Sequence, residues 1–233
     1  MANNSVNKII QTLKLFLGDA VDRGVCKNVT FRSRKFRVPK QEVHNIYLTE
    51  EELGRLARLD LENETRLERV RDAFLIGSYT GLRFSDFTNI NPENIKKVKG
   101  RKILEVLTIK TKEKVFIPLH PMVESILEKY EYHSPTHMSN QKMNAYLKEI
   151  ARRAEFDTII LKERISGAQM RVEKFKKWEL VSTHTARRSF ATNAYKNGVN
   201  AISIMKMTGH RTETSFMKYI KAVSYTHLTL PTS

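Results

Sequence analysis

Apolar residues recur at steps of three and four along several stretches of the chain, which is the spacing of amphipathic helices. The first stretch extends from Val6 to Ala20 and predicts a helix over residues 5–23. Thr49 and Glu52 form a capping box that predicts a helix to about Leu59. The same spacing predicts later helices over residues 64–79, 121–130, 139–154, 185–197, 201–207 and 213–222.

The helical spacing is lost between Ile95 and Leu119. Two β-rich stretches, over residues 102–109 and 114–119, flank a polar turn at residues 111–113, and this arrangement predicts a β-hairpin. Residues 157–182 fit neither pattern. We therefore expect an α+β fold that is mostly helical, with a small antiparallel sheet or hairpin.

The same patterns suggest how the chain is divided. Residues 25–47 lose periodicity and carry basic residues around Pro39, which predicts a basic linker between a terminal helix at residues 1–24 and a main domain at residues 48–223. Residues 224–233 are rich in Thr, Ser and Leu and resemble translated sequencing adaptor. We interpret them as an assembly artefact, with a frayed terminus as the alternative.

The composition and charge of the chain indicate the class of molecule that it binds. The 233 residues include 41 Lys and Arg against 25 Asp and Glu, a net charge of +16, which predicts a polyanionic partner such as nucleic acid. No apolar run approaches the roughly 20 residues of a membrane span, so no membrane contact is expected. The single cysteine, Cys26, excludes an internal disulfide and suits the cytoplasm.

Two arginine positions could bind one phosphate. His184 and Arg187 are three residues apart, so they project from one face of a helix. Arg83 follows the helix-stopping Gly81 and supplies a second guanidinium at a turn. Two such groups can stabilise the charge that grows on a phosphate in a transition state. The alternatives are an exposed basic turn for the first pair and a salt bridge to Asp86 for Arg83.

In their order along the chain, these residues resemble the signature of the tyrosine recombinase (phage integrase) family, which is Arg, Lys, His-x-x-Arg, His or Trp, and Tyr. The resemblance covers about residues 5–223 and is strongest over 182–221. The motif Tyr-Leu-Thr-Glu-Glu-Glu-Leu at residues 47–53 resembles integrases of Bacteroides-type mobile elements in particular. The resemblance implies the catalytic fold of DNA breaking-rejoining enzymes.

The resemblance also implies a mechanism. Tyr219 would attack a DNA phosphate and form a 3′-phosphotyrosyl bond, while Arg83 and Arg187 clamp the phosphate. His184 and His210 would complete the acid–base groups. This chemistry conserves the phosphodiester energy and uses neither a metal nor another cofactor.

Two assignments have competitors in the sequence. The resemblance implies that Lys110, by its position on the hairpin, is the general acid, and Lys112 and Lys114 remain alternatives. Tyr219 competes with Tyr195 and Tyr225, and its step of nine residues from His210 favours it.

The implied partner is double-stranded DNA, bound by a homo-oligomer that would be a tetramer for the full-length protein, in the bacterial cytoplasm at the nucleoid. We expect the linker to cross the duplex, as in the family. The residues expected to contact DNA are Arg32, Arg34, Lys35, Arg37, Lys112 and Arg188.

The chain also departs from the family pattern. We expect that only the last helix of the family's core-binding domain has a counterpart here, at residues 1–24, and that the family's C-terminal segment is cut or replaced after Val223. We therefore expect truncation to impair recombination. Two alternatives follow, which are DNA relaxation like that of type IB topoisomerases and an inactive DNA-binding fragment.

Overall fold

The structure is a computed structural model that describes residues 3–36, 45–166 and 169–220. The chain divides into two compact units. The first unit combines Met1–His44 with Ile159–Phe175, and the second combines Asn45–Thr158 with Lys176–Ser233. Among the described residues, no helix is both long enough and apolar enough to cross a membrane.

The first unit contains the predicted N-terminal helix. Helix α1 spans Asn3–Asp22, and its apolar residues Ile9 and Phe16 are 56% and 66% exposed. A short 3-10 helix, η1 (Thr30–Arg32), lies in the predicted linker. Strands β4 (Ile159–Ser166) and β5 (Gln169–Lys176) form a two-stranded sheet in a region where the sequence pattern was ambiguous.

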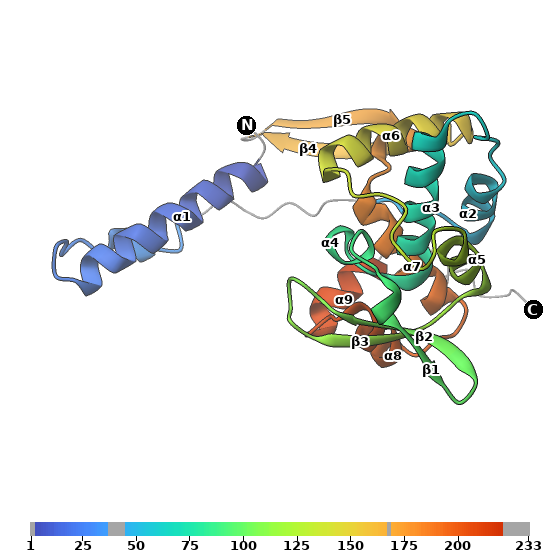
Figure 1. The fold of residues 1–233 in the computed structure, drawn as a ribbon. Helices are drawn as coiled ribbons and strands as arrows, with labels where there is room; N and C mark the ends of the chain where they lie inside the picture. The colour runs from blue at the N-terminus through green and yellow to red at the C-terminus, as the bar shows by residue number, and fades with distance from the viewer. Residues whose placement is uncertain (1–2, 37–44, 167–168, 221–233) are drawn as a thin grey trace, which may run out of the picture. The chain divides into compact units, whose positions relative to one another are not determined.

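The second unit is built around helix α3 (Thr65–Thr80), which contacts α2 (Glu50–Ala57), α5 (Pro121–Lys129), α6 (Asn140–Arg153) and α7 (Thr183–Lys196) (Figure 1). Because neighbours surround it, α3 buries residues on all sides, including Val70, Phe74 and Ile76. The predicted capping box at the start of α2 is confirmed, since Thr49 accepts from the Glu52 backbone and Glu52 accepts from the Thr49 backbone.

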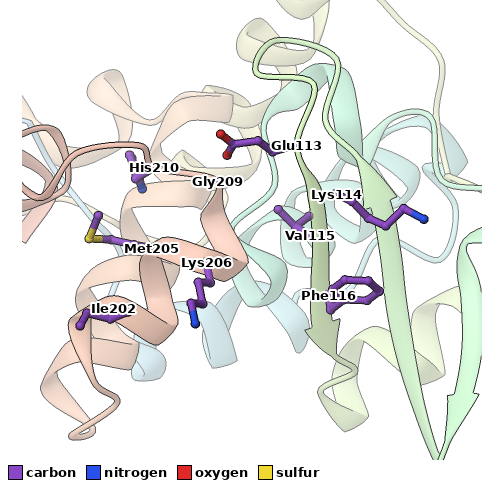
Figure 2. Close-up of a pocket in the computed structure, with 9 residues that line it drawn as sticks. All are labelled: Glu113, Lys114, Val115, Phe116, Ile202, Met205, Lys206, Gly209 and His210. Atoms are coloured by element: carbon purple, nitrogen blue, oxygen red, sulfur yellow. The ribbon is translucent and has the colours of Figure 1, made fainter.

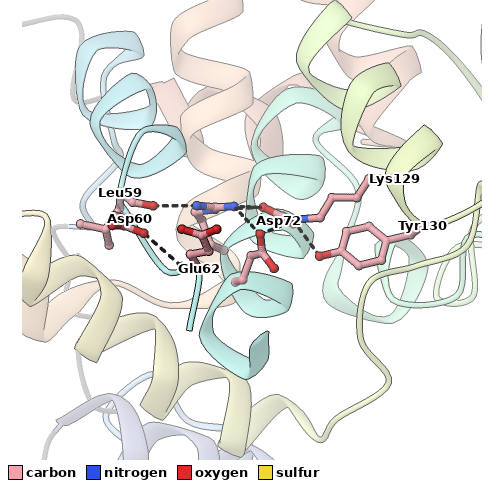
Figure 3. A network of polar contacts seen from close by, with 8 residues as sticks. Leu59, Asp60, Glu62, Asp72, Lys129 and Tyr130 are labelled. Carbon is pink, nitrogen blue, oxygen red and sulfur yellow. Dashed lines mark hydrogen bonds and ion pairs between the residues drawn. The ribbon is translucent and has the colours of Figure 1, made fainter. Parts of the chain in front are cut away.

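A polar network fixes α3 against its neighbours (Figure 3). Asp72 is 2% exposed, and its carboxylate lies 2.9 Å from Arg71 and 2.9 Å from Lys129 of α5. The Tyr130 hydroxyl donates to the same carboxylate at 2.8 Å, and Arg71 donates to the Leu59 carbonyl at 2.8 Å. The buried charge is thus compensated by Arg71 on the same helix and by Lys129 and Tyr130 at the end of α5, while Arg71 also links α3 to Leu59.

The predicted hairpin is confirmed and is part of a three-stranded antiparallel sheet, in the order β1 (Ile95–Val98), β2 (Arg101–Leu107) and β3 (Lys114–Pro118). Val106 pairs with Val115, and Leu104 pairs with Ile117 on the buried face. Strand β1 was not predicted from the sequence, because Lys96 and Lys97 make it polar and exposed.

The last three helices surround a second, smaller apolar cluster. Helices α8 (Ala201–Thr208) and α9 (Glu213–Ile220) both pack on α7. The buried members of this cluster are Ala191, Ile204, Phe216 and Ile220, whereas Ala186 of α7 belongs to the main core. The short helices α4 (Phe84–Phe87), η2 (Pro92–Asn94) and η3 (Lys177–Leu180) were not predicted, because four residues or fewer show no periodicity. Residues 37–44 and 224–233 lie outside the described residues.

Candidate active site

Helix α7 carries the His-x-x-Arg motif on its first turns. Its start is fixed on α6, since the Thr183 backbone N–H donates to Asn144 Oδ1 and the Thr183 hydroxyl donates to Asn140 Oδ1, both at 2.8 Å. These two hydrogen bonds therefore fix the position of the first turn of α7, which carries the motif. His184 and Arg187 both lie within the helix, on one face as predicted.

Arg187 is the largest fully buried side chain described, with 1% exposure. Its Nη1 donates to the carbonyl oxygen of Gly81 at 2.8 Å, and its Nη2 lies 3.3 Å from His210 Nε2. Burial, and then the nearby charge of Arg83, lower the pKa of Arg187 to about 10. The guanidinium is still charged near neutral pH, so this site holds a buried cation.

Gly81 sets the approach of Arg83. It ends α3 in the left-handed conformation, with φ of 68°, and Arg83 is then the N-cap of α4. A Cβ on Gly81 would lie 2.4 Å from Phe190 Cδ1, so the close approach of α7 requires glycine. The turn that directs Arg83 and the carbonyl that holds Arg187 thus belong to one tripeptide.

Several polar atoms beside these arginines are buried without a partner in the described part of the chain. They are Nη1 of Arg83, Nε of Arg187 and Oδ2 of Asp86. Unpaired buried N–H groups are costly, and an anion placed between the two guanidinium groups would satisfy them. The pair is therefore suited to bind a phosphate.

Asp86 joins this cluster to the hairpin. Its Oδ1 accepts from the backbone N–H of Ile109 at 2.9 Å, next to Lys110. From the sequence alone, Asp86 is expected only as a salt-bridge partner of Arg83. The spacing Arg83-x-x-Asp86 was visible, but its link to a hairpin 23 residues later was not.

Lys110 is exposed at the turn between β2 and β3, and it is close enough to His184 to contribute to lowering the histidine pKa. Of the alternatives, Lys112 is exposed in the left-handed conformation with φ of 55°, and Lys114 forms an ion pair with Glu105 at 2.9 Å. Arg211 donates to the Thr111 carbonyl at 2.8 Å and further restrains the turn.

His210 follows the left-handed Gly209 at the end of α8 and borders a cleft of about 530 Å³ between α8 and β3 (Figure 2). Arg187 can only donate, so His210 Nε2 accepts its hydrogen bond. The Thr208 hydroxyl lies 2.7 Å from His210 Nδ1 and donates to the Ile204 carbonyl, which leaves the histidine hydrogen on Nδ1. Burial, and then Arg187 and Arg83, lower the pKa of His210 to about 3.

Tyr219 on α9 is brought to this cluster. Its hydroxyl lies 2.9 Å from His184 Nε2, and its ring centroid is 4.8 Å from that of His210. Tyr195 is on α7 and 39% exposed, and Tyr225 lies outside the described residues. Of the two tyrosines of this set that the structure describes, Tyr219 contacts both histidines.

His184 is in a strongly cationic environment. The residue as a whole is exposed, yet desolvation of its ring by packed neighbours is the largest effect that lowers its pKa, to about 4, and positive charges add to it. A neutral imidazole can accept the Tyr219 proton, and the surrounding cations can stabilise both the phenolate and a bound phosphate. The charges come from three segments, in decreasing order of effect Arg188, Arg187, Arg83 and Lys110.

The residues expected to contact DNA are divided between the two units. Arg34 and Lys35 are exposed, and Arg32 lies 3.5 Å from Asp22, all within the first unit. Arg37 lies outside the described residues. Arg188 lies instead over the Tyr219 ring, with its Cζ 4.5 Å from the ring centroid. Among the described residues, no three His, Cys, Asp or Glu side chains are grouped so that they could hold a metal ion.

Comparison with known proteins places this geometry in context. Residues 46–225 match the model of the phage integrase family. A tyrosine recombinase of Thermosipho africanus (strain TCF52B) is 27% identical over 166 residues, which are 70% of this chain and 53% of the relative. The chain thus spans about half the length of this curated relative.

Two solved structures share the fold. A lambda integrase dimer bound to a COC′ core site gives a TM-score of 0.68 at 19% identity, over 93% of this chain and 72% of that one. A lambda integrase tetramer bound to a Holliday junction gives 0.66 at 20% identity, over 91% and 60%. This likeness confirms the expected mostly helical α+β fold.

Proposed function

Because the chain belongs to the phage integrase family of tyrosine recombinases, we propose that it cuts and rejoins DNA through a covalent bond to Tyr219. The observation that carries this proposal is the contact between the Tyr219 hydroxyl and His184 Nε2, at 2.9 Å, beside two arginines with unpaired buried N–H groups. A nucleophile, a proton acceptor and an anion site are the groups that such a reaction needs.

The reaction we propose balances without a further reactant. The Tyr219 oxygen attacks the phosphorus of one DNA phosphodiester, its proton passes to the neutral His184, and the bond to the 5′-oxygen breaks. The 3′-phosphate remains bonded to Tyr219. Attack of a 5′-hydroxyl on the phosphotyrosyl bond then restores a phosphodiester and releases the tyrosine.

The other residues have distinct roles in this proposal. Arg83 and Arg187 hold the non-bridging oxygens and stabilise the added charge, and the Arg187–His210 contact keeps that guanidinium in place. Lys110 protonates the departing 5′-oxygen, since its turn is held beside the site by Asp86. Each group acts where charge or a proton moves.

The wider assignment rests on the relatives. Lambda integrase has been solved as a dimer on a core site and as a tetramer on a Holliday junction. We propose that the full-length form of this protein likewise acts on double-stranded DNA as a homo-oligomer, in the recombination of a mobile element at the bacterial nucleoid. Because the chain spans about half the length of the curated relative, DNA cleavage and rejoining are the activities to test in this chain itself.

The test is covalent trapping. The chain is incubated in EDTA with a pool of random-sequence duplexes that carry nicks, so that a short 5′-fragment diffuses away after cleavage. We expect an adduct that survives denaturation, that is lost in Tyr219→Phe and that is retained in Tyr195→Phe. The second variant is the matched control, because it removes a hydroxyl from α7 outside the site.

Other outcomes separate the alternatives. An adduct that needs Mg²⁺ or survives in Tyr219→Phe would overturn the mechanism. DNA binding without an adduct would assign the chain as a DNA-binding fragment. An adduct together with relaxation of supercoiled plasmid, but without strand transfer between duplexes, would favour topoisomerase-like activity.

A further inference from the structure

Helix α7 contacts Tyr219 through a residue outside the His-x-x-Arg motif. His184 and Arg188 are four residues apart, so they lie one above the other on the same face of the helix. His184 contacts the tyrosine hydroxyl, and Arg188 places its guanidinium over the ring, with Cζ 4.5 Å from the centroid. The tyrosine is thus held at its polar end and on its face by one pair of side chains.

The contact of Arg188 is distinct from that of its neighbour. The Arg187 Cζ is 5.9 Å from the same ring centroid, its nitrogens bond to Gly81 and His210, and its guanidinium also forms a side-chain hydrogen bond with Tyr219. Arg188 has the shorter distance to the ring and is partly buried. A cation over an aromatic face is attracted by the negative charge of that face, and the attraction strengthens when water is excluded.

We propose that Arg188 is a positioning residue, which holds the ring of Tyr219 so that its hydroxyl meets His184, and that it does not serve as a DNA-phosphate contact. This inference rests on the proposed cleavage by Tyr219. The ring also packs against the second apolar cluster and lies edge-to-face with His184 and His210, and Arg188 adds a cation over the ring. An arginine on the adjacent helix therefore fixes a side chain that could otherwise rotate away from the phosphate.

Arg188 also belongs to the charges that act on His184. The Arg188 charge is the second-largest effect, after burial, that lowers the pKa of His184 to about 4. Its removal should raise that pKa, so that His184 becomes protonated, and unable to accept a proton, at a higher pH. The groups that face His184 are Arg187 and Arg188 on α7, Arg83 before α4, Lys110 on the hairpin, His210 after α8 and Tyr219 on α9.

The experiment compares Arg188→Gln and Arg188→Lys with the wild-type chain, using the nicked duplex that the wild type cleaves best. The control is Arg69→Gln, which removes one exposed positive charge from α3. Three quantities are measured: DNA affinity as a function of salt, the single-turnover cleavage rate at saturating DNA, and the pH dependence of that rate.

For Arg188→Gln, we expect the saturated rate to fall roughly 3- to 30-fold, as the loss of one cation–π contact implies. The salt dependence of affinity should match that of Arg69→Gln, and the acidic limb of the rate should move to higher pH. Arg188→Lys should restore part of the rate and leave the acidic limb in place, because it keeps the charge.

Three results would overturn the inference. The first is a salt slope lower by about 0.9 than that of the control, which is the signature of one lost phosphate contact. The second is a saturated rate equal to that of the wild type, and the third is an acidic limb that stays in place in Arg188→Gln. Failure of the wild-type chain to form any adduct would instead refute the proposed function.

Discussion

Replacing Gly81 with alanine should affect stability and activity together, because one residue turns the chain and also holds Arg187. Gly81 has φ of 68°, a conformation in which alanine costs about 1–2 kcal/mol. The new Cβ would lie 2.4 Å from Phe190 Cδ1 and 2.8 Å from Thr208 Cγ2. These distances require the ring and the helix ends to move, which costs about 1–3 kcal/mol more.

The chain contains a matched control. Gly198 follows α7, also has positive φ, 81°, and has no atom within 4 Å of the position of a Cβ. Gly198→Ala should therefore lose only the conformational cost, about 1–2 kcal/mol of the free energy of unfolding. Gly81→Ala should lose the conformational and steric costs together, about 2–5 kcal/mol. Urea denaturation of both variants measures the difference directly.

The same substitution should impair cleavage beyond its effect on folding. Phe190 is on α7 between Arg187 and the second cluster, so a displaced ring also displaces the helix from the Gly81 carbonyl. A misplacement of about 1 Å in a group that binds the reacting phosphate costs on the order of 10²-fold in rate. We expect such a loss in single-turnover cleavage by folded Gly81→Ala, and none in Gly198→Ala. Equal losses of stability in the two variants would refute the steric reasoning, and full cleavage by Gly81→Ala would refute the role of its carbonyl.

Two further predictions concern proton transfer and pH. The Lys110→Ala variant should cleave ordinary DNA slowly, and its cleavage rate should recover on a substrate whose bridging 5′-oxygen is replaced by sulfur, because a thiolate leaves without a proton. The cleavage rate of Asp86→Ala should recover in part on the same substrate, because this change frees the Ile109 backbone that positions Lys110. Recovery of cleavage in Lys112→Ala or Lys114→Ala, and not in Lys110→Ala, would show that the general acid is one of these neighbouring lysines. In the folded state, the pKa values of His184 and His210 are lowered to about 4 and about 3. Below the ordinary histidine pKa of about 6.5, the unfolded state therefore binds more protons than the folded state. The free energy of unfolding should then decrease as pH falls from 6.5 to 4. Urea denaturation at about pH 7.5 and pH 5 measures this, and an unchanged pH dependence in the His184→Gln, His210→Gln double variant would contradict it.

Sequence patterns predicted the long elements of this fold because each carries its own signal. The helices α3, α6 and α7 have full apolar stripes or clear end signals such as Gly81, and the hairpin has alternating residues around a polar turn. Strand β1 and helix α4 lack such a signal. Pairing with β2 makes the basic segment Ile95–Val98 a strand, and this is a tertiary effect.

The candidate site shows the same division. The resemblance to the family signature indicated Arg83, His184, Arg187, His210 and Tyr219, and the structure brings them together. The supporting contacts were not predictable, since they join distant segments through a backbone carbonyl at Gly81, the Asp86 carboxylate and the Thr208 hydroxyl. None of these groups has a sequence signature of its own.

From the small apolar cluster beneath α9 we expect two levels of cooperativity in this protein. The main core includes residues from α2 to α7, whereas α9 is anchored by Phe216 and Ile220 in a cluster of four buried residues. Local opening free energies follow the number of buried contacts, so α9 can undock at a cost well below global unfolding. Native-state hydrogen exchange would then report an early-exchanging α9 in a domain whose circular dichroism and melting temperature are normal. Substitutions in this cluster would behave as losses of activity in a well-folded protein, and screens based on stability alone would not detect them.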